Sequence, residues 1–227
     1  MWQSVFSADI NGDGYIDFFA GNWGENSKLN VSKNNPLKLY IKDFDSNGSV
    51  EQILCYTREG KEYTFLAKDE LERALPVLKK AYLKYSEVAG KTVQYMFYDL
   101  FKDYQELKAE TLSTSYFIND TKGGFIQHSL PKQLQLAPVF SFTSLSNGKL
   151  PLYLACGNFY GVIPYEGQYD GLYPTAFSID KQLVSVSKEN SFNELVGEFR
   201  DAKWIMGKDG KKILVISRNN NSLLFFQ

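Results

Sequence analysis

Oxygen-bearing side chains recur at every second position in one short stretch near the start of the chain. Residues 9–17 read DINGDGYID, with a glycine where the chain must turn sharply. Side chains spaced in this way converge on one point, and hard cations such as Ca²⁺ are held by about 6–8 oxygen ligands. We therefore expect a calcium site formed by the side chains of Asp9, Asn11, Asp13 and Asp17 and by the backbone carbonyl of Tyr15.

A second copy of this spacing follows at residues 43–51, which read DFDSNGSVE. Its expected ligands are the side chains of Asp43, Asp45, Asn47 and Glu51 and the backbone carbonyl of Ser49. Both cations are expected to be structural, because a site within a turn between two strands stabilises only the folded chain. The repetition favours two calcium sites over a chance run of turn residues.

Three other interpretations explain the loops less well. An EF-hand needs a glutamate at position 12, but Ala20 and Leu54 occupy that position, and strands are expected after both loops. Plain Asp/Asn/Gly turns need no metal, yet their converging carboxylates would repel one another. The general acid and base of a glycosidase would leave the asparagines, the glycines and the repetition unexplained.

Charge and composition exclude several classes of function. The chain has 25 Lys+Arg and 26 Asp+Glu, so no strong positive field is present to recruit nucleic acid. His128 is the only histidine, which excludes multi-histidine zinc sites and argues against a histidine-based triad. The sequence also offers no phosphate-binding loop and no nucleophile beside a base. We therefore expect a protein that is not an enzyme.

Apolar runs in this chain are short, and no transmembrane segment is expected. The start of the chain, MWQS, has neither the basic nor the apolar region of a signal peptide. Cys55 and Cys156 lie in the apolar runs ILCY and LYLACGN. Such cysteines are more often small buried hydrophobic residues than disulfide partners, and the sequence leaves their pairing open.

Short apolar or alternating runs between turn residues predict that the loops belong to a mainly β chain. Strands are expected at 18–20, 37–42, 51–57, 61–66, 113–119, 125–130, 139–142, 152–156, 175–179, 202–206, 213–217 and 223–226. Between them, residues 69–110 predict a helical insertion. Asp69 is expected to cap a first helix with a kink at Pro76, and Thr92 to cap a second helix that extends through Leu107. The predicted regions are therefore 1–68, 69–110 and 111–227.

The segment DINGDGYIDFFAGN resembles the FG-GAP or VCBS-type repeat of integrin-like β-propellers, in which a calcium loop joins two strands of a blade. KDFDSNGSVEQILCY is similar to a second repeat, with Glu51 in place of the usual aspartate. FTSLSNGKLPLYLACGNFYG resembles a third, which keeps Asn147-Gly148 and the glycine–asparagine ending. Thr143, Leu145 and Pro151 stand where this repeat would need acidic ligands, so no cation is expected there.

The order of segments along nearly the whole chain also resembles the C-terminal portion of large bacterial VCBS-repeat proteins. The similar segments are GNWGENSK, PLKLYIKDFDSNGS, GKEYTFLAKDEL, GNFYGVIPYEGQYDGLY and SRNNNSLLFF. The resemblance implies a partial β-propeller of three or four blades, completed by the remainder of a larger propeller or by a second copy. It also implies an extracellular, periplasmic or cell-surface location.

A tyrosine-rich segment, residues 158–174, is the candidate ligand surface, because tyrosine rings suit a sugar or a peptide. The candidate contacts are Tyr160, Tyr165, Glu166, Tyr169, Asp170 and Tyr173. The simpler interpretation, which we favour, is that these aromatic residues pack between blades. The expected function is a calcium-stabilised, non-catalytic binding or scaffolding module for a protein or glycan ligand. The alternative is an accessory or catalytic part of a polysaccharide-active enzyme.

Overall fold

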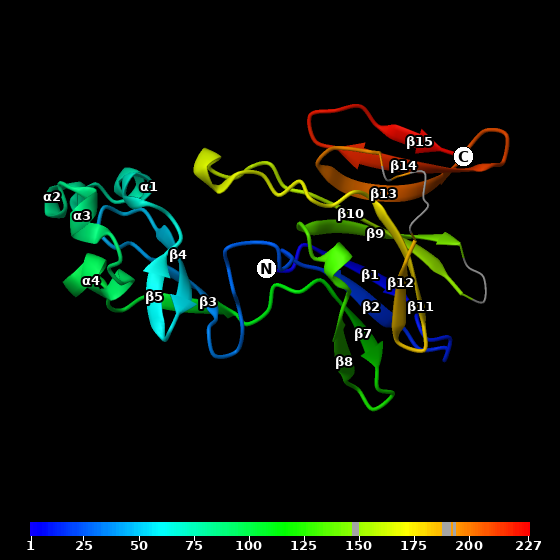
Figure 1. The fold of residues 1–227 in the computed structure, drawn as a ribbon, viewed down its shortest axis with the longest axis horizontal. Helices are drawn as coiled ribbons and strands as arrows, with labels where there is room; N and C mark the ends of the chain where they lie inside the picture. Colours follow the sequence, from blue (N-terminus) through cyan, green and yellow to red (C-terminus); the bar gives the residue numbers. More distant parts are fainter. Residues whose placement is uncertain (147–149, 188–191, 193) are drawn as a thin grey trace. The chain divides into compact units, whose positions relative to one another are not determined.

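A computed structural model describes residues 1–146, 150–187, 192 and 194–227 (Figure 1). The third repeat's Asn147-Gly148 therefore lies outside the described residues. The chain divides into two units. Residues 1–27 and 112–227 form the first, which we call the β unit, and residues 28–111 form the second, which we call the inserted unit.

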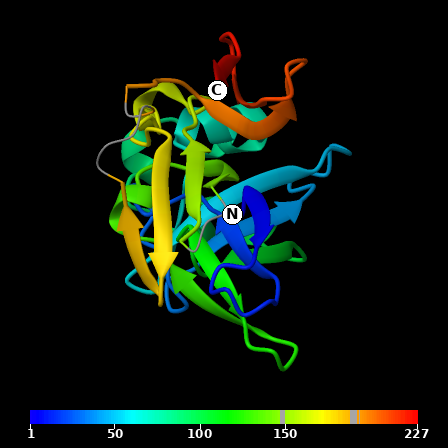
Figure 2. The same cartoon turned by 90° about the vertical axis from the view of Figure 1, so that its right-hand side faces the viewer.

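The described part of the β unit holds three antiparallel sheets. The first has the order β1-β2-β7-β8 and consists of β1 (Ser4–Ala8), β2 (Asp17–Gly21), β7 (Ser115–Asn119) and β8 (Phe125–Ser129). The second consists of β9 (Val139–Ser146), β10 (Leu152–Gly157), β11 (Thr175–Asp180) and β12 (Leu183–Val186), each paired with the next. The third consists of β13 (Phe199–Met206), β14 (Lys212–Arg218) and β15 (Leu224–Phe226). The β7–β8 hairpin projects from the unit with its turn outermost (Figures 1 and 2).

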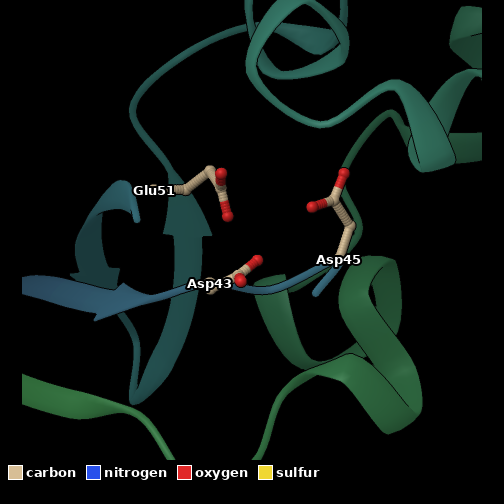
Figure 3. A group of neighbouring side chains, drawn as sticks. All are labelled: Asp43, Asp45 and Glu51. Atoms are coloured by element: carbon tan, nitrogen blue, oxygen red, sulfur yellow. The ribbon is translucent and has the colours of Figure 1, made fainter. Parts of the chain in front are cut away.

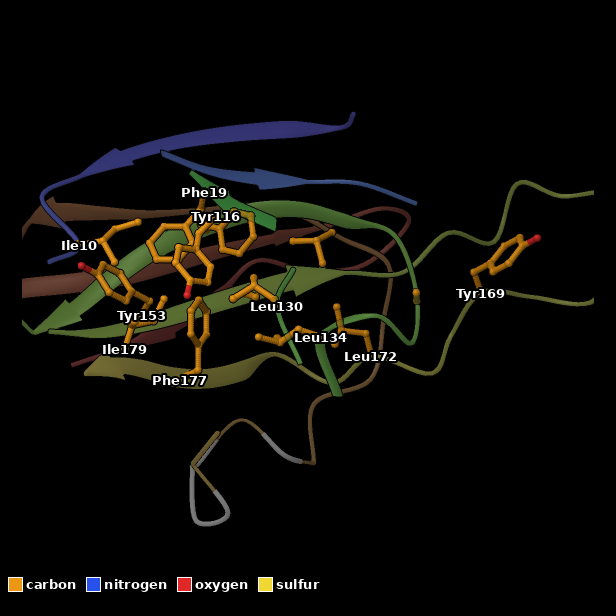
Figure 4. Close-up of a cluster of buried hydrophobic side chains, with 14 residues drawn as sticks. Ile10, Phe19, Tyr116, Leu130, Leu134, Tyr153, Tyr169, Leu172, Phe177 and Ile179 are labelled. Atoms are coloured by element: carbon orange, nitrogen blue, oxygen red, sulfur yellow. The ribbon is translucent and has the colours of Figure 1, made fainter. Parts of the chain in front are cut away.

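Strand β10 is buried on both faces, which makes the second sheet the middle layer of the β unit. On one face, Tyr153 belongs to the cluster around Phe19, whose side chain is fully buried (Figure 4). The rings of these two residues lie 4.7 Å apart, centroid to centroid. On the other face, Leu154 packs with Phe199 and Ile216 of the third sheet. Neighbouring side chains of a strand point to opposite faces, so the sequence LYLAC can serve two cores at once.

Two glycines, at the ends of β2 and β10, allow the start of β9 to lie closely against the backbone. A Cβ on Gly21 would lie 2.1 Å from the carbonyl oxygen of Val139, and one on Gly157 would lie 1.9 Å from that of Pro138. Real Cβ atoms do not approach a carbonyl oxygen so closely. These glycines belong to the endings Gly21-Asn22 and Gly157-Asn158 of the first and third repeats. Packing requires a glycine at each position, because a side chain would occupy the space taken by the backbone at the start of β9.

The inserted unit packs short helices on one face of a four-stranded antiparallel sheet. The sheet has the order β5-β4-β3-β6, from β3 (Leu37–Lys42), β4 (Glu51–Arg58), β5 (Lys61–Thr64) and β6 (Gln105–Ala109). The helices are α1 (Lys68–Ala74), α2 (Pro76–Ala81), α3 (Tyr85–Val88) and α4 (Val93–Phe97), followed by the 3₁₀ turn η1 (Tyr98–Leu100). Tyr40, Ile53 and Cys55 of the sheet share one buried cluster with Leu71 and Val93 of the helices.

The predicted mainly β class is confirmed, and several elements lie where the sequence placed them. Strand β3 has the predicted bounds, and the break between α1 and α2 falls at Pro76. Thr92 caps α4, because its hydroxyl accepts a hydrogen bond from the backbone N–H of Tyr95 at 3.3 Å.

The predicted second helix through Leu107 was wrong. The backbone of Tyr98 has a φ of +44°, which ends α4 and is followed only by the short turn η1, and Leu107 lies in β6. Pairing of β6 with β3 overrides the helical spacing of the apolar residues. Asp69 lies in the first turn of α1 rather than at its cap, which is Ala67.

Both cysteines are buried and free. Burial raises the pKa of the Cys55 thiol to about 12 and also raises that of Cys156. Among the described residues, the longest apolar helical stretch is too short to cross a bilayer.

Candidate metal centre

Each acidic loop closes a hairpin between two neighbouring antiparallel strands, and the two hairpins have the same register. Ala8 pairs with Asp17 across the first loop, and Lys42 pairs with Glu51 across the second. The last acidic residue of each loop is therefore also the first residue of the following strand. This placement ties the loop to the sheet at the point where the chain turns.

The first aspartate of each loop organises the turn through backbone N–H groups. The carboxylate of Asp9 accepts hydrogen bonds from the N–H groups of Asp13 at 3.1 Å and Gly14 at 3.0 Å. The carboxylate of Asp43 accepts the corresponding bonds, four and five residues further on, at 3.0 and 2.8 Å. The same spacing of residue types therefore produces the same local fold twice.

Left-handed backbone conformations also recur at matching positions. The φ angles are +76° at Gly12 and +87° at Gly14 in the first loop, and +59° at Ser46 and +89° at Gly48 in the second. Glycine adopts such angles without the steric cost that a Cβ brings. The two sharp bends curl each loop around its acidic side chains.

The last acidic residue closes each loop from the strand side. Asp17 is fully buried and accepts hydrogen bonds from the N–H groups of Ile10 at 2.9 Å and Asn119 at 2.8 Å. Glu51 accepts the matching bond from Phe44 at 2.9 Å through Oε2. Asn119 lies on β7, so the first loop is anchored by a strand that follows it by 102 residues. No local sequence signal identifies this contact.

Three carboxylates converge in the second loop. One oxygen from each of Asp43, Asp45 and Glu51 lies within 4.8 Å of the other two, and Figure 3 shows the side chains facing a common space. The Oδ1 atom of Asp45 is buried and finds no hydrogen-bond partner among the described residues. A buried carboxylate oxygen that lacks a donor is costly. These negatively charged oxygens suit a hard cation as ligands. The cation would also satisfy the buried oxygen of Asp45, which lacks a hydrogen-bond donor.

The first loop holds its side chains by internal hydrogen bonds. The Nδ2 atom of Asn11 donates to Oδ2 of Asp13 at 2.8 Å, and the backbone N–H of Tyr15 donates to Oδ1 of Asp13 at 2.8 Å. The carboxylates of Asp9 and Asp17 also affect the pKa of a buried core residue, Tyr153. Burial, followed by the negative charges of Asp9 and Asp17, raises the pKa of Tyr153 to about 12.

The outermost expected ligands are open to solvent in both loops. Tyr15, Asn47 and Ser49 are exposed, and the backbone N–H of Ser49 donates to the side-chain oxygen of Asn47 at 2.8 Å. The expected ligands of each loop thus lie along one continuous turn. Of the two sets, only the second gathers three acidic groups within 4.8 Å of one another among the described residues.

The hairpin between β13 and β14 carries a related turn that the sequence reasoning missed. Gly210 has a φ of +76°, and the backbone N–H of Lys211 donates to Oδ1 of Asp209 at 3.2 Å. This is the same contact that Tyr15 makes with Asp13 in the first loop. The signal in the sequence is the Asp-Gly pair before the apolar run ILVIS.

The tyrosine-rich segment forms an extended excursion between β10 and β11. Its base is packed, because Tyr169 pairs with Phe159, and Trp23 contacts both rings at centroid distances of 5.1 and 5.4 Å. Tyr169 is therefore part of the core, as the simpler interpretation expects. Of the other candidate contacts, Tyr160 and Glu166 are half-buried, whereas Tyr165, Asp170 and Tyr173 are exposed.

No family model, curated protein or solved structure matches this chain. The FG-GAP or VCBS resemblance therefore stays a prediction that depends on the residues of the repeated loops.

Proposed function

We propose that this chain is a calcium-stabilised, non-catalytic binding module made of blade-like antiparallel sheets. The observation that carries the proposal is the convergence of Asp43, Asp45 and Glu51 in a loop whose hydrogen bonds repeat those of the first loop. Like charges held together disfavour the ionised state unless an opposite charge compensates them. A cation supplies that compensation in both hairpins.

The donors suit calcium better than other common metals. Asp43, Asp45 and Glu51, together with the side chain of Asn47 and the carbonyl of Ser49, offer only oxygen atoms, which hard cations prefer. Magnesium should compete poorly, because it requires a tight octahedron and loses its waters reluctantly. A bound calcium ion would offset two of the three negative charges of Asp43, Asp45 and Glu51 and clamp β3 to β4. Its role is thus structural.

The arrangement of the sheets supports a partial propeller. Each sheet of the β unit is a meander, and the middle one packs against both neighbours. Pairing across the third sheet places Lys203, Val215 and Phe225 on one face, and Phe225 is 61% exposed. This face would pack against a further sheet, from the remainder of a larger propeller or from a second copy. An extracellular, periplasmic or cell-surface location accords with calcium-dependent modules of this kind.

Calcium binding at equilibrium tests the metal sites. Titration of the full chain by calorimetry should give two calcium ions per chain, with magnesium much weaker. Asp43→Ala should remove one of them and Asp13→Ala the other, whereas Asp99→Asn, in the 3₁₀ turn η1, should leave both. Titration without calcium binding in the wild type, or with unchanged stoichiometry in both variants, would overturn the proposal.

The non-catalytic assignment has its own test. The full chain should release no sugar from a panel of polysaccharides, with or without EDTA. Turnover that survives calcium removal and is abolished by Asp170→Asn would make the protein an enzyme instead.

Sedimentation velocity tests the partial propeller, because an exposed apolar sheet face should cause association that Phe225→Lys weakens. A wild type that stays strictly monomeric at high concentration would favour a small closed domain.

A further inference from the structure

The inserted unit contains a cavity that shares no residue with the acidic loops. Its volume is about 480 Å³, within the range of about 300–1,000 Å³ common for small-ligand sites. One wall is the hairpin of β4 and β5, and the other comes from the start of α1, from α3 and α4, and from the segment that joins α3 to α4. Every lining residue belongs to the inserted unit, so the cavity is formed within that unit alone.

The lining of this cavity is positively charged, although the whole chain has a net charge of −1. Arg58, Lys68 and Lys91 contribute cations, and Glu59 is the acidic residue among the lining residues. Lys68 is already paired with Glu72 of α1. The Nε atom of Arg58 lies 3.9 Å from Oε1 of Glu59, but both side chains are exposed. Such surface ion pairs contribute little to stability. The Nζ atom of Lys91 lies over the ring of Tyr95, 4.8 Å from its centroid, a contact that leaves the positive charge in place. Arg58 and Lys91 are therefore the cations that an anionic ligand would meet without displacing a buried ion pair.

Aromatic rings accompany these cations along the hairpin. Tyr56 and Tyr63 are paired across β4 and β5, and their rings stack with centroids 5.9 Å apart. The next pair on the same face is Arg58 with Lys61, of which Arg58 lines the cavity. A pair of rings is thus followed by a pair of cations, about 6.6 Å further along the strands. Tyr85, which is 54% exposed, adds a third tyrosine to the lining.

We propose that this cavity binds an acidic polysaccharide built from uronic acid units. A tyrosine ring offers a flat apolar surface to the C–H face of a sugar, and the guanidinium of Arg58 can grip a carboxylate with two parallel hydrogen bonds. Lys91 supplies a second charge for a neighbouring unit. An acidic peptide would match the cations but would leave the paired rings unused. The inference rests on the proposed binding function and names the class of its ligand.

The probe for this site is a short oligogalacturonate, measured by calorimetry against the full chain at a fixed, low calcium concentration. The reference ligand is a neutral galactose oligomer of the same length. Binding should be detected only with the acidic oligomer, and its affinity should fall as salt is added, because exposed charges are screened. Arg58→Gln and Lys91→Gln should each weaken binding by about tenfold, as expected when one charge-assisted contact is lost.

Two lysines of α2 supply the matched control. Lys79→Gln and Lys80→Gln remove exposed cations that do not line the cavity, and they should leave the affinity unchanged. Equal binding of the neutral oligomer, equal loss in the control variants, or tighter binding of a polyglutamate peptide would each overturn the inference. Calcium stoichiometry measured on the same preparation separates the two proposals. Two bound calcium ions with no oligogalacturonate binding would reject only the polysaccharide site.

Discussion

Asp45→Asn should change the stability of the protein in opposite directions with and without calcium. The substitution removes one charge from the group Asp43, Asp45 and Glu51 and preserves the shape of the side chain. One oxygen of each group lies within 4.8 Å of the others, and two unit charges at that separation repel by about 0.9 kcal/mol in water and by more in a less polar surrounding. Asp45 faces two such partners, so the variant should gain roughly 2 kcal/mol of unfolding free energy when no cation is present.

Calcium reverses the sign, because the same carboxylate then becomes an attractive ligand. A cation at a hundredfold excess over its Kd stabilises the folded chain by about 2.7 kcal/mol, and loss of a charged ligand should remove most of this. One kcal/mol corresponds to about 2–4 °C for a chain of this length. In calcium the variant keeps its gain of roughly 2 kcal/mol but lacks most of the 2.7 kcal/mol from the cation, so it should be less stable than the wild type by about 0.7 kcal/mol. The variant should therefore melt roughly 4–8 °C above the wild type in EDTA and roughly 1–3 °C below it in calcium.

Differential scanning calorimetry at pH 7 and low ionic strength measures both shifts. Asp99→Asn, which also removes one negative charge from the inserted unit, is the matched control and should give the same small shift in both buffers. An Asp45→Asn shift of equal sign and size in calcium and in EDTA would refute the reasoning. Asp45 would then act through its packing, and the three carboxylates would not share a cation.

Two further predictions concern packing and pH. Gly157→Ala should destabilise the protein by about 3 kcal/mol or more in denaturant titrations, because its Cβ would lie 1.9 Å from the Pro138 carbonyl oxygen. Gly210→Ala, at a position with open space and a φ of +76°, should lower the free energy of unfolding by only about 1 kcal/mol. Equal losses in the two variants would contradict the close approach of Gly157 to the Pro138 carbonyl. Burial alone would raise the pKa of Glu62, but hydrogen bonds from Lys38 and Tyr40 outweigh it and hold that pKa below the ordinary value of a glutamate. Stability from this carboxylate is complete above pH 4.5 and is lost as the pH falls through the lowered pKa, so Glu62→Gln should show a smaller acid-induced loss than the wild type.

The two loops and the strands that follow them can be predicted from the residues alone, whereas β1, before the first loop, was not predicted. Apart from the bond that Asn119 donates to Asp17, the hydrogen bonds described in the two loops join residues at most seven positions apart, as between Phe44 and Glu51. Such contacts depend only on which residue types stand at which spacing. The alternation in β3 and the break at Pro76 are local in the same sense. Local rules could therefore predict them from the residues alone.

Contacts between distant segments determine which loop gathers its charges and where the helices end. The first loop matches the calcium pattern more fully, yet Asn119 of a distant strand engages Asp17, whereas the longer side chain of Glu51 reaches Asp43 and Asp45. Leu107 has helical spacing but lies in a strand, because β6 completes the sheet beside β3. The cavity beside Arg58 and Lys91 likewise joins segments more than 30 residues apart. Pairing and packing between distant segments have no local signature, since their free energy depends on which surfaces meet once the chain has folded.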